Sequence, residues 1–403
     1  MGLIVLRRLW FVIVTFFFWH LSYAQSEEKD LQGDFELELQ FDNRFFFKDG
    51  LYESQERNFL SLAAQPEYNL EWGKGNHIFK ISLFGRWDQH DDNRTHFDVR
   101  ELYYQRVKNN WELSIGLKKV FWGVTESVHL VDVINQTDQV ESFDGEQKLG
   151  QPMVHYSNLT NFGNFELFYL PYQRKRQFPA REGRVRFPEV VEREDFDIDS
   201  DMEEWRPSFA FRWSHYFGPV DIGISHFYGV GREPLFTGLG TESQEFFYPI
   251  MNQTGIDVQA VTGPMLWKVE SIYRDTEFQD FLALAVGAEY TFSNIASKGL
   301  DIGVLLEYLY DERDDLAISG FANDLFIATR LAFNDVNSTE ILGGMVYDLD
   351  HKSRLFSVET SRRIGDSWKV EIEARIFDNL QEAEFLHFFR DDSFLQFGLS
   401  KFF

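Results

Sequence analysis

Apolar and polar residues alternate strictly along many stretches of this chain. In residues 111–118, Trp111, Leu113, Ile115 and Leu117 share one face, and polar or small residues occupy the other. The same period of two recurs in residues 220–228, 281–292 and 368–376. Strict alternation over about 4–8 residues indicates a β-strand with one apolar face. The pattern therefore predicts an all-β protein.

The lengths of these stretches separate two all-β architectures. Strands of a soluble sandwich are mostly about 5–6 residues long, whereas a tilted strand that crosses a bilayer needs about 9–11. The alternating stretches here have about the second length, and short turns such as "WGKGN" take turns with longer charged connections. We therefore expect a transmembrane antiparallel up-and-down β-barrel with short periplasmic turns, long outer loops and a water-filled lumen.

Turn signals divide the chain into about 18 strands, an even number typical of single-chain barrels. The predicted strands begin near Asp34, Asn58, His77, Phe97, Trp111, Gly150, Asn164, Trp205, Pro219, Gln253, Pro264, Phe278, Gly299, Ala322, Thr339, Lys352, Trp368 and Ser393. Two stretches leave the count open. "EAEFLHFFRDD" could form a hairpin in an outer loop, and "EFFYPIMNQTGIDV" could hold more than one element. Sixteen strands are the alternative.

Residues 1–24 have the layout of a secretory signal peptide: Arg7 and Arg8, an apolar run, and a small-residue site ending at Ala24. Its apolar run is shorter than the roughly 20 residues of a spanning helix. The predicted mature domain is residues 25–403. Composition fits an exported barrel, because the chain combines a net charge of −26 with 17% aromatic residues, among them 43 Phe. It has no Cys, which excludes disulfides, thiolate metal sites and Cys nucleophiles.

The connection at residues 122–150 is predicted to fold inward and to narrow the lumen. Its apolar run "VHLVDVIN" suits a loop packed against a barrel wall, since a solvated loop has no use for such a core. The predicted constriction acids are Glu126, Asp132, Asp138, Glu141 and Asp144, and the predicted wall bases are Arg44, Arg86, Arg212, Arg274, Arg330 and Arg375. Facing rows of opposite charge would select ions at a constriction. The alternative is that these residues only form structural ion pairs in the wall.

The order of motifs in residues 97–190 resembles a large, poorly characterised family of porin-like outer-membrane proteins of Gram-negative bacteria. The motifs are an Arg-Glu-x-Tyr strand, Gly-x-x-x-x-x-Trp-Gly, Asp-Val-Ile-Asn-x-x-Asp and an Arg-rich loop. The resemblance implies a barrel in the cell outer membrane and passive diffusion of small hydrophilic or ionic solutes. It names no solute. By analogy with related porins, it also implies that the loop after such a strand enters the lumen.

Residues 173–204 are predicted to be a charged outer loop with a basic first half and an acidic second half. The halves could fold back on each other, or the basic half could enter the lumen. Asp195, Asp197 and Asp199 match the first EF-hand ligand spacings, but Ser200 and Arg206 fail the positions that need Gly and Glu. A solvated acidic loop is therefore expected in place of a metal site. For a surface loop, lipopolysaccharide phosphates are a better partner than nucleic acid, which is not expected.

The stretch "QFGLSKFF" resembles the signal that the outer-membrane barrel assembly machinery reads. Gln396, Gly398 and Phe403 match its polar, glycine and aromatic positions, whereas Lys401 departs from the usual apolar residue. The expected partners are thus outer-membrane lipid and lipopolysaccharide, the assembly machinery and small hydrophilic solutes. A homotrimer is possible on sequence grounds alone.

Two other classes of function remain open. An outer-membrane enzyme would need a catalytic set, and Ser127, His129 and Asp132 lie close together in sequence. Such sets are common by chance, and the chain has no nucleophile elbow and no His-Glu-x-x-His motif. We therefore predict a protein that is not an enzyme and has no catalytic residues, metal ligands or cofactor. A closed barrel with a structural or surface-interaction role is the other alternative to a channel.

Overall fold

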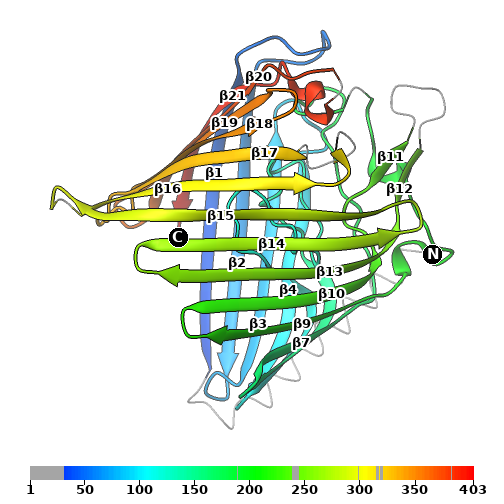
Figure 1. Ribbon diagram of the computed structural model, residues 1–403, viewed down its shortest axis with the longest axis vertical. Coiled ribbons are helices and arrows are strands. Elements are labelled where there is room, and N and C mark those ends of the chain that lie inside the picture. Colours follow the sequence, from blue (N-terminus) through cyan, green and yellow to red (C-terminus); the bar gives the residue numbers. More distant parts are fainter. Residues whose placement is uncertain are drawn as a thin grey trace.

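The structure is a computed structural model, and it describes residues 31–187, 189–237, 245–297, 299–314, 317, 321–382 and 384–403. The signal peptide predicted at residues 1–24 lies outside the described residues. Within the described part of the chain, eighteen strands form one antiparallel sheet that closes on itself. Figure 1 shows this wall, with the early strands behind and β13–β17 crossing in front.

The wall strands follow chain order around the barrel. They are β1 (Gln32–Phe46), β2 (Asn58–Trp72), β3 (His77–Asp88), β4 (His96–Lys108), β5 (Trp111–Lys118), β6 (Gln151–Thr160), β7 (Gly163–Leu170), β9 (Ser208–Phe217), β10 (Val220–Val230), β13 (Ile250–Thr262), β14 (Met265–Thr276), β15 (Asp280–Ile295), β16 (Leu300–Asp311), β17 (Asn323–Ala332), β18 (Glu340–Asp348), β19 (Arg354–Ile364), β20 (Trp368–Asp378) and β21 (Phe394–Phe402). A separate small sheet consists of β8 (Phe196–Ile198), β11 (Leu235–Thr237) and β12 (Glu245–Tyr248).

The first and last wall strands pair directly and close the barrel. Their antiparallel register runs from Glu38 opposite Phe402 to Phe46 opposite Phe394. Beyond it, the Leu37 and Phe403 backbones exchange hydrogen bonds of 3.3 and 3.0 Å. Closure removes both free sheet edges, whose unpaired backbone groups would otherwise need partners. The predicted all-β barrel of 18 strands is confirmed, and each predicted strand start lies within three residues of the observed one.

The two ambiguous stretches do not change the strand count. "EFFYPIMNQTGIDV" does hold two elements, β12 and the first part of β13, but only β13 belongs to the wall. "EAEFLHFFRDD" contains the short 3-10 helix η5 (Phe385–Phe389) and forms no hairpin among its described residues.

The alternation seen in the sequence becomes an outer and an inner face of the wall. On β14, Trp267 and Tyr273 are exposed, whereas Lys268, Glu270 and Ile272 between them are buried. The exposed residues face away from the barrel and the buried ones face its interior, because successive side chains of a strand point to opposite sides. An apolar outside and a mixed inside are what a membrane barrel requires.

The connections differ sharply between the two ends of the barrel. At one end, here called the turn end, strands are joined by residues 73–76, 109–110, 161–162, 218–219, 263–264, 296–299, 333–339 and 365–367. At the other, here called the loop end, the connections include residues 47–57, 119–150, 171–207, 231–249, 312–322 and 379–393. This confirms the predicted asymmetry. Among the described residues, no helix is both long and apolar enough to cross a bilayer.

The charged loop at residues 173–204 is folded against the barrel. Its basic half is partly buried: Arg184 pairs with Asp392 at 2.6 Å, and Arg174 pairs with Asp98 at 2.6 Å. The two halves also touch, since Lys175 pairs with Glu204 at 2.7 Å. Short elements organise the acidic half, namely η2 (Arg193–Asp195), β8 and η3 (Glu203–Trp205). The basic half therefore packs against the barrel and also contacts the acidic half.

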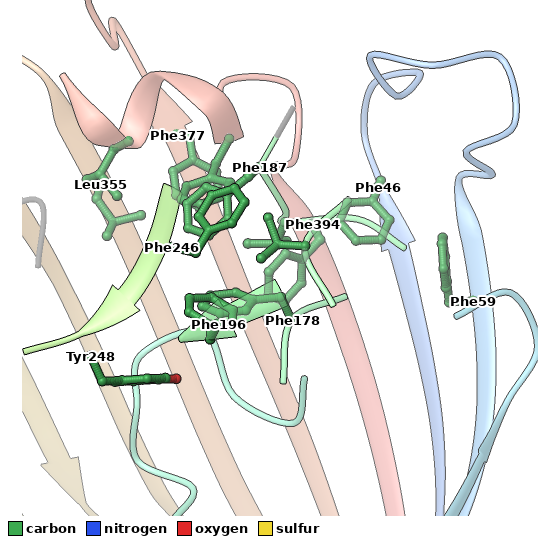
Figure 2. Packing of buried hydrophobic residues seen from close by; sticks show 14 of the residues in the cluster. Phe46, Phe59, Phe178, Phe187, Phe196, Phe246, Tyr248, Leu355, Phe377 and Phe394 are labelled. Carbon is green, nitrogen blue, oxygen red and sulfur yellow. The ribbon is translucent and has the colours of Figure 1, made fainter. Parts of the chain in front are cut away.

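A large apolar cluster fills the loop end, and we call it the mouth cluster. It consists of Phe46, Phe59, Phe178, Val185, Phe187, Val191, Phe196, Ile198, Val230, Phe246, Tyr248, Leu355, Phe377, Leu386, Phe389 and Phe394. These residues come from wall strands, from the 171–207 loop, from the small sheet and from η5. Figure 2 shows the Phe187 and Phe377 rings beneath the η5 helix, with Phe178 and Phe196 stacked lower down. The outer loops are thus joined by a shared core.

Gly116 on β5 lies where the wall leaves no room for a side chain. This glycine has φ of 136°, and an added Cβ would collide with the Leu102 carbonyl oxygen of the paired strand. We expect Gly116→Ala to reduce the folded fraction, since backbone strain of this kind costs about 1–3 kcal/mol. The measurement is the heat-modifiable mobility shift of the refolded barrel in gel electrophoresis.

Gly343→Ala on β18 is the matched control. Its added Cβ would meet only the Val358 Cγ2 atom, at 3.9 Å, which is ordinary contact. The control should fold as the parent does. Equal folding of both variants would show that the wall yields at Gly116.

Candidate functional site

The connection between β5 and β6, residues 119–150, lies inside the barrel, and we call it the inward loop. Its side chains Trp122, Val131, Val133 and Ile134 are buried in one cluster. Their partners are inner-face residues of the wall: Met153, Phe168, Leu170, Ala210, Phe227, Met251, Ile272, Phe281 and Ala283. The apolar run that marked this loop in the sequence is thus its contact with the wall.

Two wall carboxylates hold the backbone of the inward loop. Glu270 on β14 accepts hydrogen bonds from the Val124, Thr125 and Val131 N–H groups and from the Thr125 hydroxyl, at 2.6–3.2 Å. Glu307 on β16 is nearly fully buried and accepts hydrogen bonds from the loop as well.

Glu307 binds the next two residues of the inward loop in the same way. The Glu126 and Ser127 N–H groups each donate to its carboxylate at 2.9 Å, and the Ser127 hydroxyl donates at 2.6 Å. Hydrogen bonds to charged groups contribute about 1.5–3 kcal/mol each. Together the two glutamates therefore fix this part of the loop to the wall.

Acids of the inward loop form ion pairs with bases on different sides of the wall. Glu126 pairs with Arg330 on β17 at 2.7 Å, and Asp144 pairs with Arg375 on β20 at 2.5 Å. On two further strands, Glu141 pairs with Arg86 on β3 at 2.9 Å, and Asp138 pairs with Arg100 on β4 at 2.5 Å. The loop thus contacts widely separated strands and spans the interior.

The five predicted constriction acids fall into two groups. The side chains of Asp132, Asp138 and Glu141 are no more than 6% exposed. Their charges are balanced by ion pairs with Lys148, Arg100 and Arg86, respectively. Glu126 and Asp144 are 23% and 33% exposed and face open space. The acid Glu146 of the same loop is 53% exposed. The exposed acids are therefore at residues 126, 144 and 146.

All six predicted wall arginines lie on wall strands and contact other interior side chains. Arg44 donates to Gln396, and Arg212 pairs with Asp257 at 2.7 Å. Arg274 pairs with Glu233 at 2.6 Å. The rest contact the inward loop, as described above. Five of the six line a cavity, and Arg212 lines neither of the two described next.

Two cavities lie on either side of the inward loop. The first has a volume of about 560 Å³ and is lined by the inward loop, by other loop-end residues and by part of the mouth cluster, and we call it the mouth cavity. The second has a volume of about 580 Å³ and is lined by the inward loop and by wall strands that include β1, β18, β19, β20 and β21, so we call it the wall cavity.

The cavities adjoin at a neck whose residues line both. The neck consists of Glu126, Phe143, Asp144 and Glu146 from the inward loop and Leu342, Glu359 and Arg375 from the wall. Phe143 also anchors the neck to the mouth cluster, with ring centroids 5.5 Å from Phe377 and 5.4 Å from Phe389. A charged neck between two chambers is an arrangement that controls passage by size and charge.

Two loop carboxylates, Glu126 at the neck and Glu233 in the mouth cavity, remain charged. Burial alone would raise the pKa of Glu126, but the charges of Arg330 and Lys268 outweigh it and lower the pKa. Burial likewise opposes ionisation of Glu233, yet Arg313 and Arg274 lower its pKa to about 2. Both side chains are therefore anionic at neutral pH.

The three residues considered for an enzyme do not form a triad. The Ser127 hydroxyl donates to Glu307, the His129 Nε2 atom lies 2.9 Å from Glu146, and Asp132 pairs with Lys148 at 3.2 Å. Elsewhere, Asp348, His351 and Glu384 bring possible ligand atoms within 4.8 Å of one another, a kind of grouping that is common without an ion.

The residues of the resembled assembly signal sit on the closing strand. Gln396 accepts a hydrogen bond from Arg44 at 2.7 Å, and Gly398 lies opposite Asp42. Phe403 is 65% exposed, beside the Lys401 ammonium. Recognition by the assembly machinery stays a prediction.

Sequence reasoning missed several residues that shape this interior. Glu270 and Glu307 each occupy an inward position of an alternating strand, which was a weak signal for a buried acid. Arg176, Arg232 and Arg313 come from loops, where no periodicity indicates which side chains enter the barrel.

Solved structures with similar folds are outer-membrane barrels. Wzi, an outer-membrane protein involved in group 1 capsule assembly in Escherichia coli and described as a carbohydrate-binding β-barrel, has a TM-score of 0.53 and 11% identity over 94% of this chain and 86% of its own. A mutant of the Rh. blastica porin has a TM-score of 0.45 and 12% identity over 92% of this chain and 100% of its own. A loop-deletion mutant of OmpT, an outer-membrane protein of Vibrio cholerae, has a TM-score of 0.46 and 11% identity over 93% of this chain and 100% of its own.

No protein-family model matches the chain. No curated protein matches it in sequence. At 11% identity, the similarity to Wzi extends to the fold alone. This chain therefore shares its closed β-barrel fold with Wzi, an outer-membrane protein.

Proposed function

We propose that this protein is a passive channel of the cell outer membrane for small hydrophilic or ionic solutes. The observation that carries the proposal is the pair of cavities that adjoin at a charged neck beside the inward loop. Together they offer a polar route along the barrel interior. The neck then acts as the constriction, with Glu126, Asp144 and Glu146 facing Arg330 and Arg375.

The wall ion pairs and the constriction are two aspects of one arrangement. Asp138 and Glu141 act as structural residues, since their partners Arg100 and Arg86 hold the loop across the interior. Asp144 does both, because it pairs with Arg375 and remains one-third exposed at the neck. The permeating ion therefore meets only part of the predicted set of acids.

A closed surface-interaction barrel is the second candidate, and the mouth cluster favours it. Packed aromatic side chains join the outer loops over the mouth cavity, for example Phe187 and Phe385 with ring centroids 5.4 Å apart. Wzi is described as a carbohydrate-binding β-barrel, so this architecture also occurs in a binding protein. Planar-bilayer recording separates the candidates, because a closed barrel gives no unitary current steps.

Release of the inward loop should enlarge the conducting path. The double variant Glu270→Gln, Glu307→Gln replaces two carboxylates that only accept hydrogen bonds with amides that also donate. The amide groups would then oppose loop N–H donors such as that of Val131. We expect a severalfold rise in single-channel conductance, together with faster proteolysis within residues 119–150.

Glu112→Gln on β5 is the matched control. Glu112 accepts a hydrogen bond from Gln105 at 2.8 Å and lines neither cavity. The control should conduct as the parent does. The double variant could assemble, lose the loop's protection from protease and still conduct as the parent does. That result would show that the inward loop does not form the constriction.

Selectivity among small ions should favour cations weakly. The wall cavity has more acidic than basic lining residues: Glu38, Asp42, Glu126, Glu141, Asp144, Glu146, Glu340, Glu359, Glu371 and Glu373 against Arg44, Arg86, Arg94, Arg100, Lys119, Arg330, Lys369 and Arg375. An acid excess raises the local cation concentration, and salt screens the effect. The reversal potential in a salt gradient should therefore show a cation preference that shrinks as ionic strength rises.

Glu359→Gln at the neck should reduce that preference, because the side chain is 48% exposed there. Glu53→Gln, in the exposed 47–57 loop, should leave it unchanged. An anion preference of the parent at low salt would contradict the selectivity prediction. The channel proposal would still stand.

A further inference from the structure

The mouth cavity combines an aromatic wall with a row of arginines. Its lining includes Phe143, Phe178, Phe187, Phe236, Phe326 and Phe389. Among the same lining residues are Arg176, Arg232, Arg274, Arg313 and Arg375. Its volume of about 560 Å³ lies within the range of about 300–1,000 Å³ typical of small-molecule sites. The function of the cavity depends on which of these arginines form ion pairs with carboxylates.

Three of these arginines have carboxylate partners. Arg274 and Arg313 share Glu233, at 2.6 and 2.8 Å, and Arg313 also pairs with Asp311 at 2.6 Å. Arg375 pairs with Asp144, Glu359 and Glu373 at 2.5–2.9 Å. These guanidinium groups are neutralised within the protein and offer no charge to a ligand.

Arg176 and Arg232 have no carboxylate partner among the described residues. Arg176 donates to the side-chain oxygens of Gln136 and Gln139 and to the Arg232 carbonyl, at 3.1–3.5 Å. Arg232 donates to the Ile134 and Val230 carbonyls, at 3.0 and 2.9 Å, and to the Gln173 side chain. All of these acceptors are neutral. Neither of the two adjacent guanidinium groups therefore forms a direct ion pair within the described part of the protein.

Arg232 also has an unused hydrogen-bond donor. The residue is only 6% exposed, and its Nη2 atom is buried without any hydrogen-bond partner. Burial lowers the pKa of Arg232 to about 9, which still leaves the guanidinium charged at neutral pH. A buried charge without a counter-ion is costly, and so is a buried donor without an acceptor. An anion in the mouth cavity, which Arg232 lines, would supply the missing counter-charge.

An apolar surface lies next to this charge. Phe178 follows Arg176 by two residues and Phe236 follows Arg232 by four, and their ring centroids lie 6.1 Å apart. Phe187 extends the surface, with its centroid 4.9 Å from that of Phe236. A ligand here would meet aromatic rings on one side and guanidinium donors on the other. A planar carboxylate suits such donors because they are arranged as a rigid fork.

We propose that the mouth cavity binds an organic anion with an apolar body, such as an aromatic monocarboxylate, through Arg176 and Arg232. The proposal names a substrate class and in that respect rests on the channel function proposed above. The apolar body packs against the Phe178, Phe187 and Phe236 rings, and the carboxylate accepts hydrogen bonds from the guanidinium groups. Small ions pass the neck under its own charge balance, while this subsite holds the larger anion.

The test is a binding measurement that needs no ion current. The probe is 2-naphthoate, titrated by calorimetry into the purified full-length barrel, with the uncharged 2-naphthamide as the matched ligand. Loss of charge-assisted hydrogen bonds weakens binding roughly ten- to hundredfold. We therefore expect 2-naphthoate to bind at least about tenfold more tightly than 2-naphthamide.

Variants assign the binding to the two arginines. Arg232→Gln and, separately, Arg176→Gln should each weaken 2-naphthoate binding about tenfold or more, and Arg232→Lys should restore part of it because the charge returns. Arg206→Gln is the control, since Arg206 donates to the Tyr228 hydroxyl and does not line the cavity. The heat-modifiable shift shows whether each variant is folded. If Arg232→Gln does not fold, Arg176→Gln decides.

Three outcomes would overturn the inference: no binding of 2-naphthoate, equal binding of 2-naphthamide, or equal binding by the folded glutamine variants. Current recording keeps the two proposals apart. A parent that binds 2-naphthoate with these dependences but never conducts refutes the channel and leaves the anion site standing. A parent that conducts but fails the binding test refutes the anion site alone.

Discussion

The closure of β1 onto β21 is the constraint on which the rest of this structure depends. In a hydrocarbon layer every backbone N–H and C=O must find a partner within the protein, so a sheet there cannot keep a free edge. The register from Glu38 opposite Phe402 to Phe46 opposite Phe394 meets that demand along the last seam. Once the wall is closed, every second side chain must point inward, and the inner faces of all eighteen strands surround one compartment.

That compartment explains why so many charges lie inside and why they are paired. Coulomb attraction is stronger at low effective dielectric, but an unpaired charge there is also more costly. Glu270 and Glu307 are compensated by loop N–H and hydroxyl donors, and Arg86 and Arg100 by Glu141 and Asp138. The inward loop is therefore held by the same groups that it neutralises. In the mouth cavity, Arg176 and Arg232 contact only neutral acceptors, and that is why a ligand is inferred there.

The mouth cluster gives the barrel two different ends. At the turn end, the connections between wall strands are short. At the loop end, aromatic packing joins the 171–207 loop, the small sheet and η5 into one layer. This layer covers the mouth cavity, whose lining combines aromatic rings with arginines, in front of the charged neck.

The sequence by itself determined the wall. Alternation and turn signals placed the start of each of the eighteen wall strands within three residues of the observed start. This was possible because successive side chains of a strand point to opposite faces of the wall, so each residue type indicates its own side. The same local logic marked residues 128–134 as wall-contacting, and Val131 and Ile134 are fully buried. Tertiary structure alone decided which charges meet. Asp138 could not be distinguished from Asp144 by sequence, yet one is buried against Arg100 and the other lines the neck. Arg176 and Arg232 lie 56 positions apart and come together only because two outer loops fold over the same mouth. Pairings between loops depend on the path of the whole chain, and no local period records them.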